Sequence, residues 1–306
     1  MASSEVDQKF LGKLAKQVEP TNPLLSSMLF KILGLSINLG EQTVKARKQC
    51  KAAAPRTPEF LELYFHILWL SREGLIMLEQ YVLPMVGDNS ELKVLVHKLR
   101  ASFYHIVVLF HNKPAVSPMG INTSIAGIPP IPRLDKGKGV DRGGAQPKYP
   151  TEGGFVGPPP GFGLPTVEDA GAFLVPSADY LPAAHEYFEK AVALADRLLW
   201  GSHPLRLSVK TEYAAFMYEC LHDQEGSRKL AQATVQEVYE ATEGLTDDMF
   251  QDASDLVTVL GKMAKRGLAS TNTVQNEGPD PVAQAKADTA SEPTESVPAT
   301  AMDNFI

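Results

Sequence analysis

The spacing of its apolar residues constrains the fold of this chain more than any other feature. Between Glu91 and His111, apolar side chains recur in steps of three or four, at Leu95, Leu99, Phe103, Ile106 and Phe110. This is the period of an α-helix and not the alternation of a β-strand. The same spacing recurs in four further segments between residues 184 and 263. Several such helices in succession predict an all-α fold, either a helical bundle or a solenoid.

Local signals place the ends of these helices. Thr57, Pro58 and Glu59 combine a capping hydroxyl, a proline at the first helical position and an acid near the positive end of the helix dipole. A helix should begin there and end near Pro84, which lacks an amide donor. We expect helices over residues 6–18, 22–51, 58–84, 91–111, 179–199, 204–221, 225–241 and 247–267.

Two segments interrupt the helical pattern. Residues 113–177 contain 12 of the 23 prolines and 12 of the 23 glycines, so we expect a disordered insert with no packed element. Residues 271–306 carry six acids and one lysine, which predicts an acidic, solvated tail. The remaining parts, 1–112 and 178–270, together have the size of one domain, and we interpret them as two parts of a single helical bundle.

Charge and cysteine content narrow the classes of partner and compartment. The net charge of −7 makes a general nucleic-acid partner unexpected. Cys50 and Cys220 lie too far apart in sequence to indicate a disulfide framework or a metal cluster, and they suit a reducing compartment. The first residues lack the apolar core of a secretory signal, and we find no apolar stretch of membrane-spanning length. We expect a soluble, cytoplasmic protein that binds neither nucleic acid nor membrane.

Catalytic motifs are weak in this sequence. Glu62 and His66 lie one helical turn apart and could begin a metal site, but two ligands are fewer than a metal site needs. A helical metalloenzyme is therefore only the alternative from another class. The sequence contains no serine elbow, phosphate-binding glycine loop or paired-thiol motif. We expect no enzymatic activity, no metal and no cofactor.

The segment His203–Leu207, followed by Phe216, Tyr218-Glu219 and Leu221, resembles the signature of the 14-3-3 phosphopeptide adaptors. Two further stretches, Leu78–Pro84 and Lys98–Ala101, agree with that family in order and spacing, and Leu11–Gln17 agrees more weakly. The resemblance implies an all-helical protomer whose antiparallel helices line a concave groove and which pairs through its first helices. It also implies a protein-binding adaptor in signal transduction.

The resemblance also implies which residues should bind a peptide. The family's phosphate ligands, a Lys and an Arg on the third helix and an Arg-Tyr pair on the fifth, fall here on Phe30, Ile37, His105 and Ile106. The family's peptide-backbone ligands, two Asn and a Glu, fall on Glu212, Glu219 and Met263, and only Glu219 keeps its type. A slip of one residue in the third helix would bring Lys31 to the lysine position.

Since a phosphate needs several converging charge-assisted donors, these changes predict a degenerate phosphate pocket. An added carboxylate at Glu212 should repel a dianion, so we expect the groove to bind apolar peptide segments independently of phosphate. Two alternatives remain open at this point. Cations displaced along the chain, at Lys45, Arg47 or Lys48, could take over phosphate binding, or Phe30 and Ile106 could simply pack into the core.

Two further expectations concern partners. Only six residues separate Gln17 from Leu24, where the family has its second helix, so homodimer formation is in question. In the insert, a rigid polyproline stem ends in an aromatic residue and resembles the ligands of GYF adaptor domains. Its residues are Pro158, Pro159, Pro160, Gly161 and Phe162. It predicts a binding motif for a proline-reading domain, with a plain linker as the alternative.

Overall fold

The computed structural model describes residues 4–52, 58–117, 119 and 167–267. The chain divides into two units, Met1–Arg266 and Gly267–Ile306, and all the described helices lie in the first unit. Every regular element within the described ranges is helical, which confirms the predicted all-α fold.

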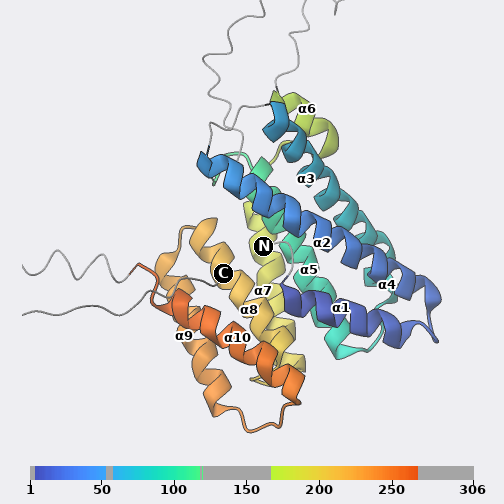
Figure 1. Ribbon diagram of the computed structural model, residues 1–306, viewed down its shortest axis with the longest axis vertical. Helices are drawn as coiled ribbons and strands as arrows, with labels where there is room; N and C mark the ends of the chain where they lie inside the picture. The colour runs from blue at the N-terminus through green and yellow to red at the C-terminus, as the bar shows by residue number, and fades with distance from the viewer. Residues whose placement is uncertain (1–3, 53–57, 118, 120–166, 268–306) are drawn as a thin grey trace, which may run out of the picture. The chain divides into compact units, whose positions relative to one another are not determined.

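The helices follow one another along the chain (Figure 1). They are α1 (Glu5–Val18), α2 (Pro23–Ala52), α3 (Pro58–Ile76), the π-helical turn η1 (Met77–Val82), α4 (Leu83–Met85), α5 (Ser90–His111), α6 (Val167–Leu174), α7 (Leu181–Leu198), α8 (Pro204–Glu219), α9 (Gln224–Glu240) and α10 (Asp247–Ala264). The eight predicted helices are all present, and most of their ends lie within one or two residues of the predicted positions.

The helix predicted over 58–84 is not uniform. Its last part forms η1, in which the amide of Leu83 donates to the carbonyl of Leu78, five residues earlier. Pro84 follows directly and has no amide to donate, so the regular hydrogen-bond ladder is interrupted at this point. The predicted helix therefore contains a π-helical turn and ends at Met85, one residue after its predicted end.

The expectation that 113–177 holds no packed element is wrong for its last part. Val167–Leu174 forms α6, which packs against α3, and Val175 is buried. Gly171 permits this approach, because a Cβ at this position would lie 3.1 Å from the His111 ring and 3.3 Å from the Tyr64 hydroxyl. Residue 118 and residues 120–166 of the predicted insert, with the motif from Pro158 to Phe162, and the predicted acidic tail lie outside the described residues.

Helix α5 is the centre of the first unit. It packs against α1, α3, α7 and α8, and Figure 1 shows α1 and α2 in front of it and α8, α9 and α10 grouped to one side. The buried aromatic side chains Phe103, Phe110, Phe188 and Phe216 fill the space around it. This arrangement brings α2, the last turns of α5 and the last turns of α8 into one region, where the predicted site lies.

Helix α2 has an unusual surface. By length and composition, Pro23–Cys50 could cross a membrane, so the expectation that no apolar stretch has membrane-spanning length is wrong. One such helix is weak evidence for a membrane span, because a core helix of a soluble protein meets the same test. In the bundle, Leu25, Leu29, Ile32 and Leu39 of α2 are buried, yet only 33% of its apolar window is buried. Much of this apolar helix therefore faces outward.

Candidate functional site

The outward face of α2 carries two of the predicted groove residues. Phe30 and Ile37 are 40% and 42% exposed, and Leu24 and Val44 on the same helix are 54% and 51% exposed. Phe30, Ile37 and Val44 are spaced by seven residues, so they lie on one side of the helix, about two turns apart. The alternative that Phe30 packs into the core is therefore wrong. Lys31, its neighbour in sequence, is also exposed.

The other two predicted phosphate positions do not lie on a surface. His105 and Ile106 of α5 are 0% and 1% exposed, so both pack in the core. The alternative prediction that Ile106 is a core residue is therefore correct. The His105 ring meets Phe188 and Phe216 edge-on, with ring centroids 5.9 and 5.3 Å apart. Burial lowers the pKa of His105, although Glu212 opposes this shift. The imidazole is therefore neutral at neutral pH and offers no accessible cation.

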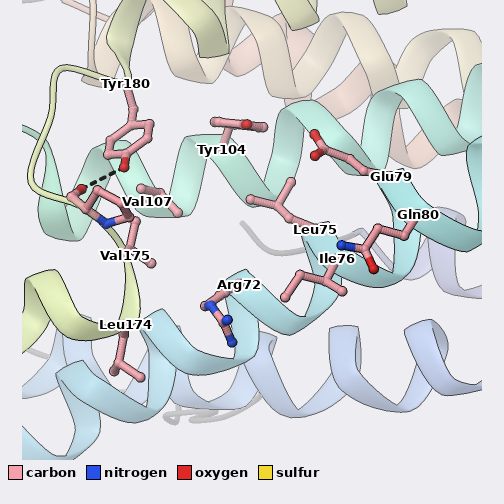
Figure 2. Close-up of a pocket in the computed structure, with 11 residues that line it drawn as sticks. Arg72, Leu75, Ile76, Glu79, Gln80, Tyr104, Val107, Leu174, Val175 and Tyr180 are labelled. Atoms are coloured by element: carbon pink, nitrogen blue, oxygen red, sulfur yellow. Dashed lines mark hydrogen bonds between the residues drawn. The ribbon is translucent and has the colours of Figure 1, made fainter.

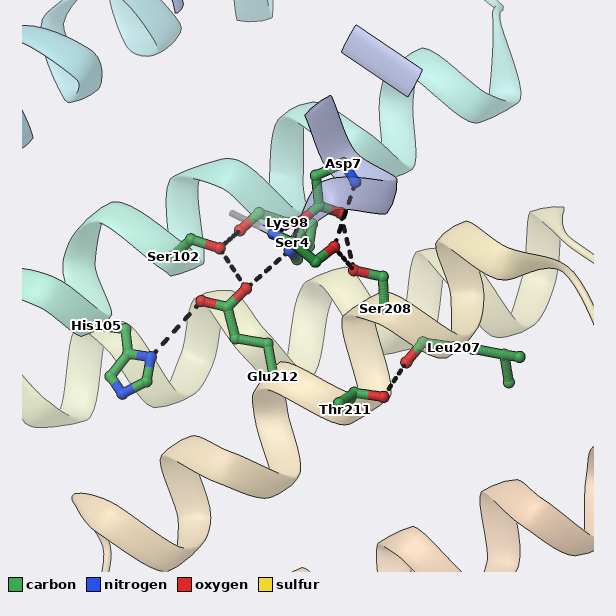
Figure 3. A network of polar contacts seen from close by, with 9 residues as sticks. All are labelled: Ser4, Asp7, Lys98, Ser102, His105, Leu207, Ser208, Thr211 and Glu212. Atoms are coloured by element: carbon green, nitrogen blue, oxygen red, sulfur yellow. Dashed lines mark hydrogen bonds and ion pairs between the residues drawn. The ribbon is translucent and has the colours of Figure 1, made fainter. Parts of the chain in front are cut away.

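Glu212 belongs to a buried polar network that joins three helices (Figure 3). The ammonium group of Lys98 in α5 pairs with Asp7 of α1, and its Nζ atom lies 2.8 Å from Oε2 of Glu212 in α8. Ser102 donates a hydrogen bond of 2.7 Å to the same carboxylate, and Ser208 donates one of 2.8 Å to Asp7. These side chains are all buried.

The charges of this network stabilise each other. Burial alone would raise the pKa of Glu212, but the Lys98 ammonium and the contact with His105 outweigh it and hold this pKa well below its usual range. Burial likewise would lower the pKa of Lys98, but the Asp7 and Glu212 carboxylates raise it. Glu212 is thus a structural partner of Lys98, and the predicted repulsion of a phosphate by a groove-facing Glu212 is wrong.

Glu219, another of the predicted groove residues, borders a pocket at the C-terminal end of α2. This cavity of about 780 Å³ is lined by Arg47, Cys50, Leu109, Ser117, Met119, Tyr218, Glu219, His222, Gln224 and Arg266. Within it, Arg47 pairs with Glu219 at 3.2 Å, and the Arg266 guanidinium lies 3.9 Å from the centre of the Tyr218 ring. Met263 of α10 is half-buried and is not among the lining residues.

The pocket therefore combines apolar walls with two arginines and one carboxylate, a lining suited to a peptide segment of mixed character. Of the cations considered as displaced phosphate ligands, Arg47 lines the pocket. Lys45 and Lys48 are exposed on α2 and do not contribute to its lining.

Smaller hollows lie elsewhere in the unit, two of them beside residues of interest. One, of about 460 Å³, is lined by Phe30, Lys31 and residues near the start of α2. The other, of about 350 Å³, lies between α3, η1, α5 and the segment around Tyr180 (Figure 2). Its lining is mostly apolar, with Arg72 on one side and Glu79 already paired with Arg100.

The described residues form neither a metal site around Glu62 and His66 nor a reactive thiol. Glu62 and His66 are exposed on α3, and the His66 ring stacks on Trp69. No group of three or more His, Cys, Asp or Glu that could hold a metal exists among the described residues. Both cysteines are free, and burial, the largest cause, raises the pKa of Cys220 to about 12, so it is not a thiolate nucleophile.

Sequence reasoning missed the partners of Glu212 and the contribution of Arg266. Two features of the sequence indicate the buried network. Ser4 and Asp7 have the spacing of a capping box, which they form at the start of α1. Lys98 falls between Leu95 and Ser102 on the apolar side of its helix, where a charge requires a buried partner. Arg266 follows the last turn of α10 and left no comparable signal.

The sequence model of the 14-3-3 protein family matches residues 177–264, which contain α7, α8, α9 and α10. No curated protein matches the chain. The match confirms the resemblance found at His203–Leu221, and the all-α architecture fits the 14-3-3 fold.

Proposed function

From the 14-3-3 match over residues 177–264, we propose that this chain is a non-enzymatic adaptor that binds segments of other proteins and does not require a phosphate group on them. Proteins of this family bind other proteins and are not enzymes. The finer part of the proposal, independence of phosphate, depends on the residues of this chain and not on the family match.

One observation carries the proposal. None of the four positions that correspond to the family's phosphate ligands presents an accessible cation. Phe30 and Ile37 are exposed but apolar, Ile106 is buried, and His105 is buried and neutral. A desolvated phosphate gains about 1.5–3 kcal/mol from each charge-assisted hydrogen bond. Because about 1.4 kcal/mol is a factor of ten in affinity, losing several such bonds weakens phosphate recognition by orders of magnitude.

A second candidate function, phosphopeptide recognition by displaced cations, is favoured by a specific observation. Arg47 and Arg266 line the same cavity. However, Arg47 is already paired with Glu219, and a phosphate would have to replace that carboxylate and overcome its repulsion. We therefore rank this function second.

The test is a titration of the full chain with matched phosphorylated and unphosphorylated forms of a 14-3-3 ligand peptide. We expect weak binding of both forms, with less than about a tenfold difference in affinity. Binding in the micromolar range or tighter that requires the phosphate would contradict the proposal. In that case Arg47→Gln should abolish the phosphate dependence, whereas Lys48→Gln, one position away but outside the pocket lining, should preserve it.

The motif from Pro158 to Phe162 supports a separate binding element for a proline-reading domain. Phe162→Ala should abolish capture of such a domain by the full chain. If the same partners are captured after this substitution, the segment is only a linker.

A further inference from the structure

We propose that the outward face of α2 binds an acidic amphipathic helix of a partner protein. This inference rests on the proposed function, because it names the kind of segment that the same helix face would bind. It follows from three properties of this face: an apolar stripe, unpaired positive charge, and room for close approach.

The apolar stripe is long, and one exposed carboxylate, Glu41, interrupts it between Ile37 and Val44. Phe30, Ile37 and Val44 repeat every seven residues, and the distance from Phe30 to Val44 along the helix is about 21 Å, at about 1.5 Å per residue. This spacing supplies one of the two apolar positions of the heptad repeat by which helices pack along each other. An extended segment has a period of two residues and would not match it.

The charge of this face favours an acidic partner. Lys31, Lys45 and Lys48 are exposed, and none of the three has an ion-pair partner within the part of the chain that the structure describes. Glu41 is exposed within the stripe and Glu19 lines the cavity beside Phe30 and Lys31, so three lysines against two glutamates leave a net positive charge. Carboxylates flanking the apolar side of an incoming helix would pair with the lysines.

The backbone of α2 is accessible in the middle of the stripe. Gly34 lies between Phe30 and Ile37 and is exposed, and a Cβ built on it meets nothing within 4 Å. A partner side chain can therefore rest on the helix backbone between the two apolar side chains. Beyond the two ends of the stripe, the cavities of about 460 and 780 Å³ offer further space for the ends of a bound segment.

The first test uses designed peptides as probes. One peptide is a stapled helix of three heptads with leucine on one side and glutamate on the flanks. Its matched forms replace every flanking glutamate by lysine, or every leucine by serine. Binding to the full chain is measured by fluorescence anisotropy. We expect the acidic form to bind, and to bind more weakly as the salt concentration increases. Equal binding of the basic form, or of the serine form, would overturn the proposal.

The second test uses variants that should leave the fold intact. Gly34→Gln places a long side chain in the open space on the stripe and should weaken binding of the acidic helix about tenfold or more. Gly261→Gln is the matched control, since this helical glycine in α10 also has open space above it. Ile37→Asp should likewise weaken binding, whereas Phe250→Asp, at another exposed apolar position, should not. Unchanged binding in both α2 variants would contradict the proposal.

The remaining outcomes identify other occupants of the face. Binding to vesicles of phosphatidylserine and phosphatidylcholine, lost in Ile37→Asp, without binding of the acidic helix, would assign the face to a membrane and overturn the inference. Self-association that disappears in Ile37→Asp would assign it to a second copy. If unphosphorylated ligand peptides bind but the acidic helix neither binds nor displaces them, this inference fails while the proposed function stands. If ligand binding requires phosphate, it is the proposed function that fails.

Discussion

At the scale of single residues, Lys98 shows how burial decides the role of a charge. Its ammonium group is fully buried between the carboxylates of Asp7 and Glu212, which belong to helices far apart in the sequence. Removing one partner of such a network leaves the others uncompensated in a medium of low polarity. The network therefore couples the position of α1 to α5 and α8.

We predict that Lys98→Met lowers the free energy of unfolding by about 3–5 kcal/mol, because two buried carboxylates then lose their counter-charge. Urea unfolding followed by circular dichroism measures the change. Lys93→Met on the same helix is the control and should have little effect, since Lys93 is only half-buried and has no ion-pair partner within the described ranges. A decrease in the free energy of unfolding of less than about 1 kcal/mol for Lys98→Met would show that the two carboxylates do not depend on the Lys98 charge.

His97 predicts a pH dependence of stability. Burial, followed by the charges of Lys190, Arg100 and Lys93, lowers the pKa of His97 from 6.5 to about 4. The folded state then resists protonation, so its stability is complete above about pH 6.5 and is lost as the pH falls towards 4. We expect the midpoint temperature of unfolding to fall between pH 7 and pH 5, and to fall less in His97→Gln. An identical decrease in both proteins would exclude His97 as a cause.

The sequence predicts which residues belong to a helix, but it does not predict whether each side chain faces the core or the solvent. Phe30 and Ile106 were both candidates for the groove and for the core. The structure exposes the first and buries the second. The difference arises because α2 has neighbours on one side, whereas α5 is surrounded by helices. Glu212 was assigned to the groove because the sequence does not show that Lys98 and Asp7 are its neighbours.

At the scale of helices, two glycines illustrate opposite constraints. Gly74 in α3 lies against α5, and a Cβ at this position would come within 2.6 Å of the Phe103 ring. Gly34 in α2 has open space above it. The first glycine allows two core helices to approach each other, whereas the second has no packing constraint within the chain and lowers the helix propensity of α2.

We therefore predict opposite effects for the same substitution. Gly74→Ala should destabilise the protein by about 1–3 kcal/mol, because the new methyl group would come within 2.6 Å of the fully buried Phe103 ring. Gly34→Ala should stabilise it by up to about 1 kcal/mol through better helix propensity. Chemical denaturation of both variants beside the unsubstituted chain gives the comparison. A stabilising Gly74→Ala would mean that α3 and α5 are not held as closely as the structure shows.

Most of the eight predicted helices were recognisable from an apolar stripe or from a local start or stop signal. The N-caps Asn89 and Thr246 accept hydrogen bonds from Leu92 and Met249, as their sequence context suggests. Helix α6 was missed because the proline and glycine content around it hides a short helix, which is stabilised by its contact with α3. The π-helical turn η1 likewise has no periodic signal of its own in six residues.

At the scale of the whole molecule, the fold could be predicted from helix periodicity and from the resemblance carried by His203–Leu221. The all-α architecture is confirmed, and the family match covers the helices from α7 to α10. The candidate site was predicted less completely. Glu219 and Arg47 do border one cavity, but no sequence pattern indicated that Arg266 and Tyr218 would join them there. Such a site depends on the ends of several helices, whose relative positions are not encoded in any one segment.

The oligomeric state is the last property that follows at this scale. The resemblance implies pairing through the first helices, but in this chain the apolar residues of α1 are buried against its own α2, α5 and α8. The exposed side chains of α1 are Glu5, Lys9, Lys13, Lys16 and Gln17, all polar. Residues 19–22 alone link α1 to α2, so no additional helix extends the docking surface.

We predict that the chain is monomeric at concentrations up to about 50 µM, because a stable dimer interface buries about 1,200–2,000 Å² and has an apolar centre, which α1 does not offer. Sedimentation velocity over a range of concentrations measures this. Ile37→Asp is examined in parallel, since self-association through α2 would disappear in this variant. A dimer at low micromolar concentration that persists in Ile37→Asp would contradict the prediction, and it would place the contact on α1 or its surroundings despite their polar surface.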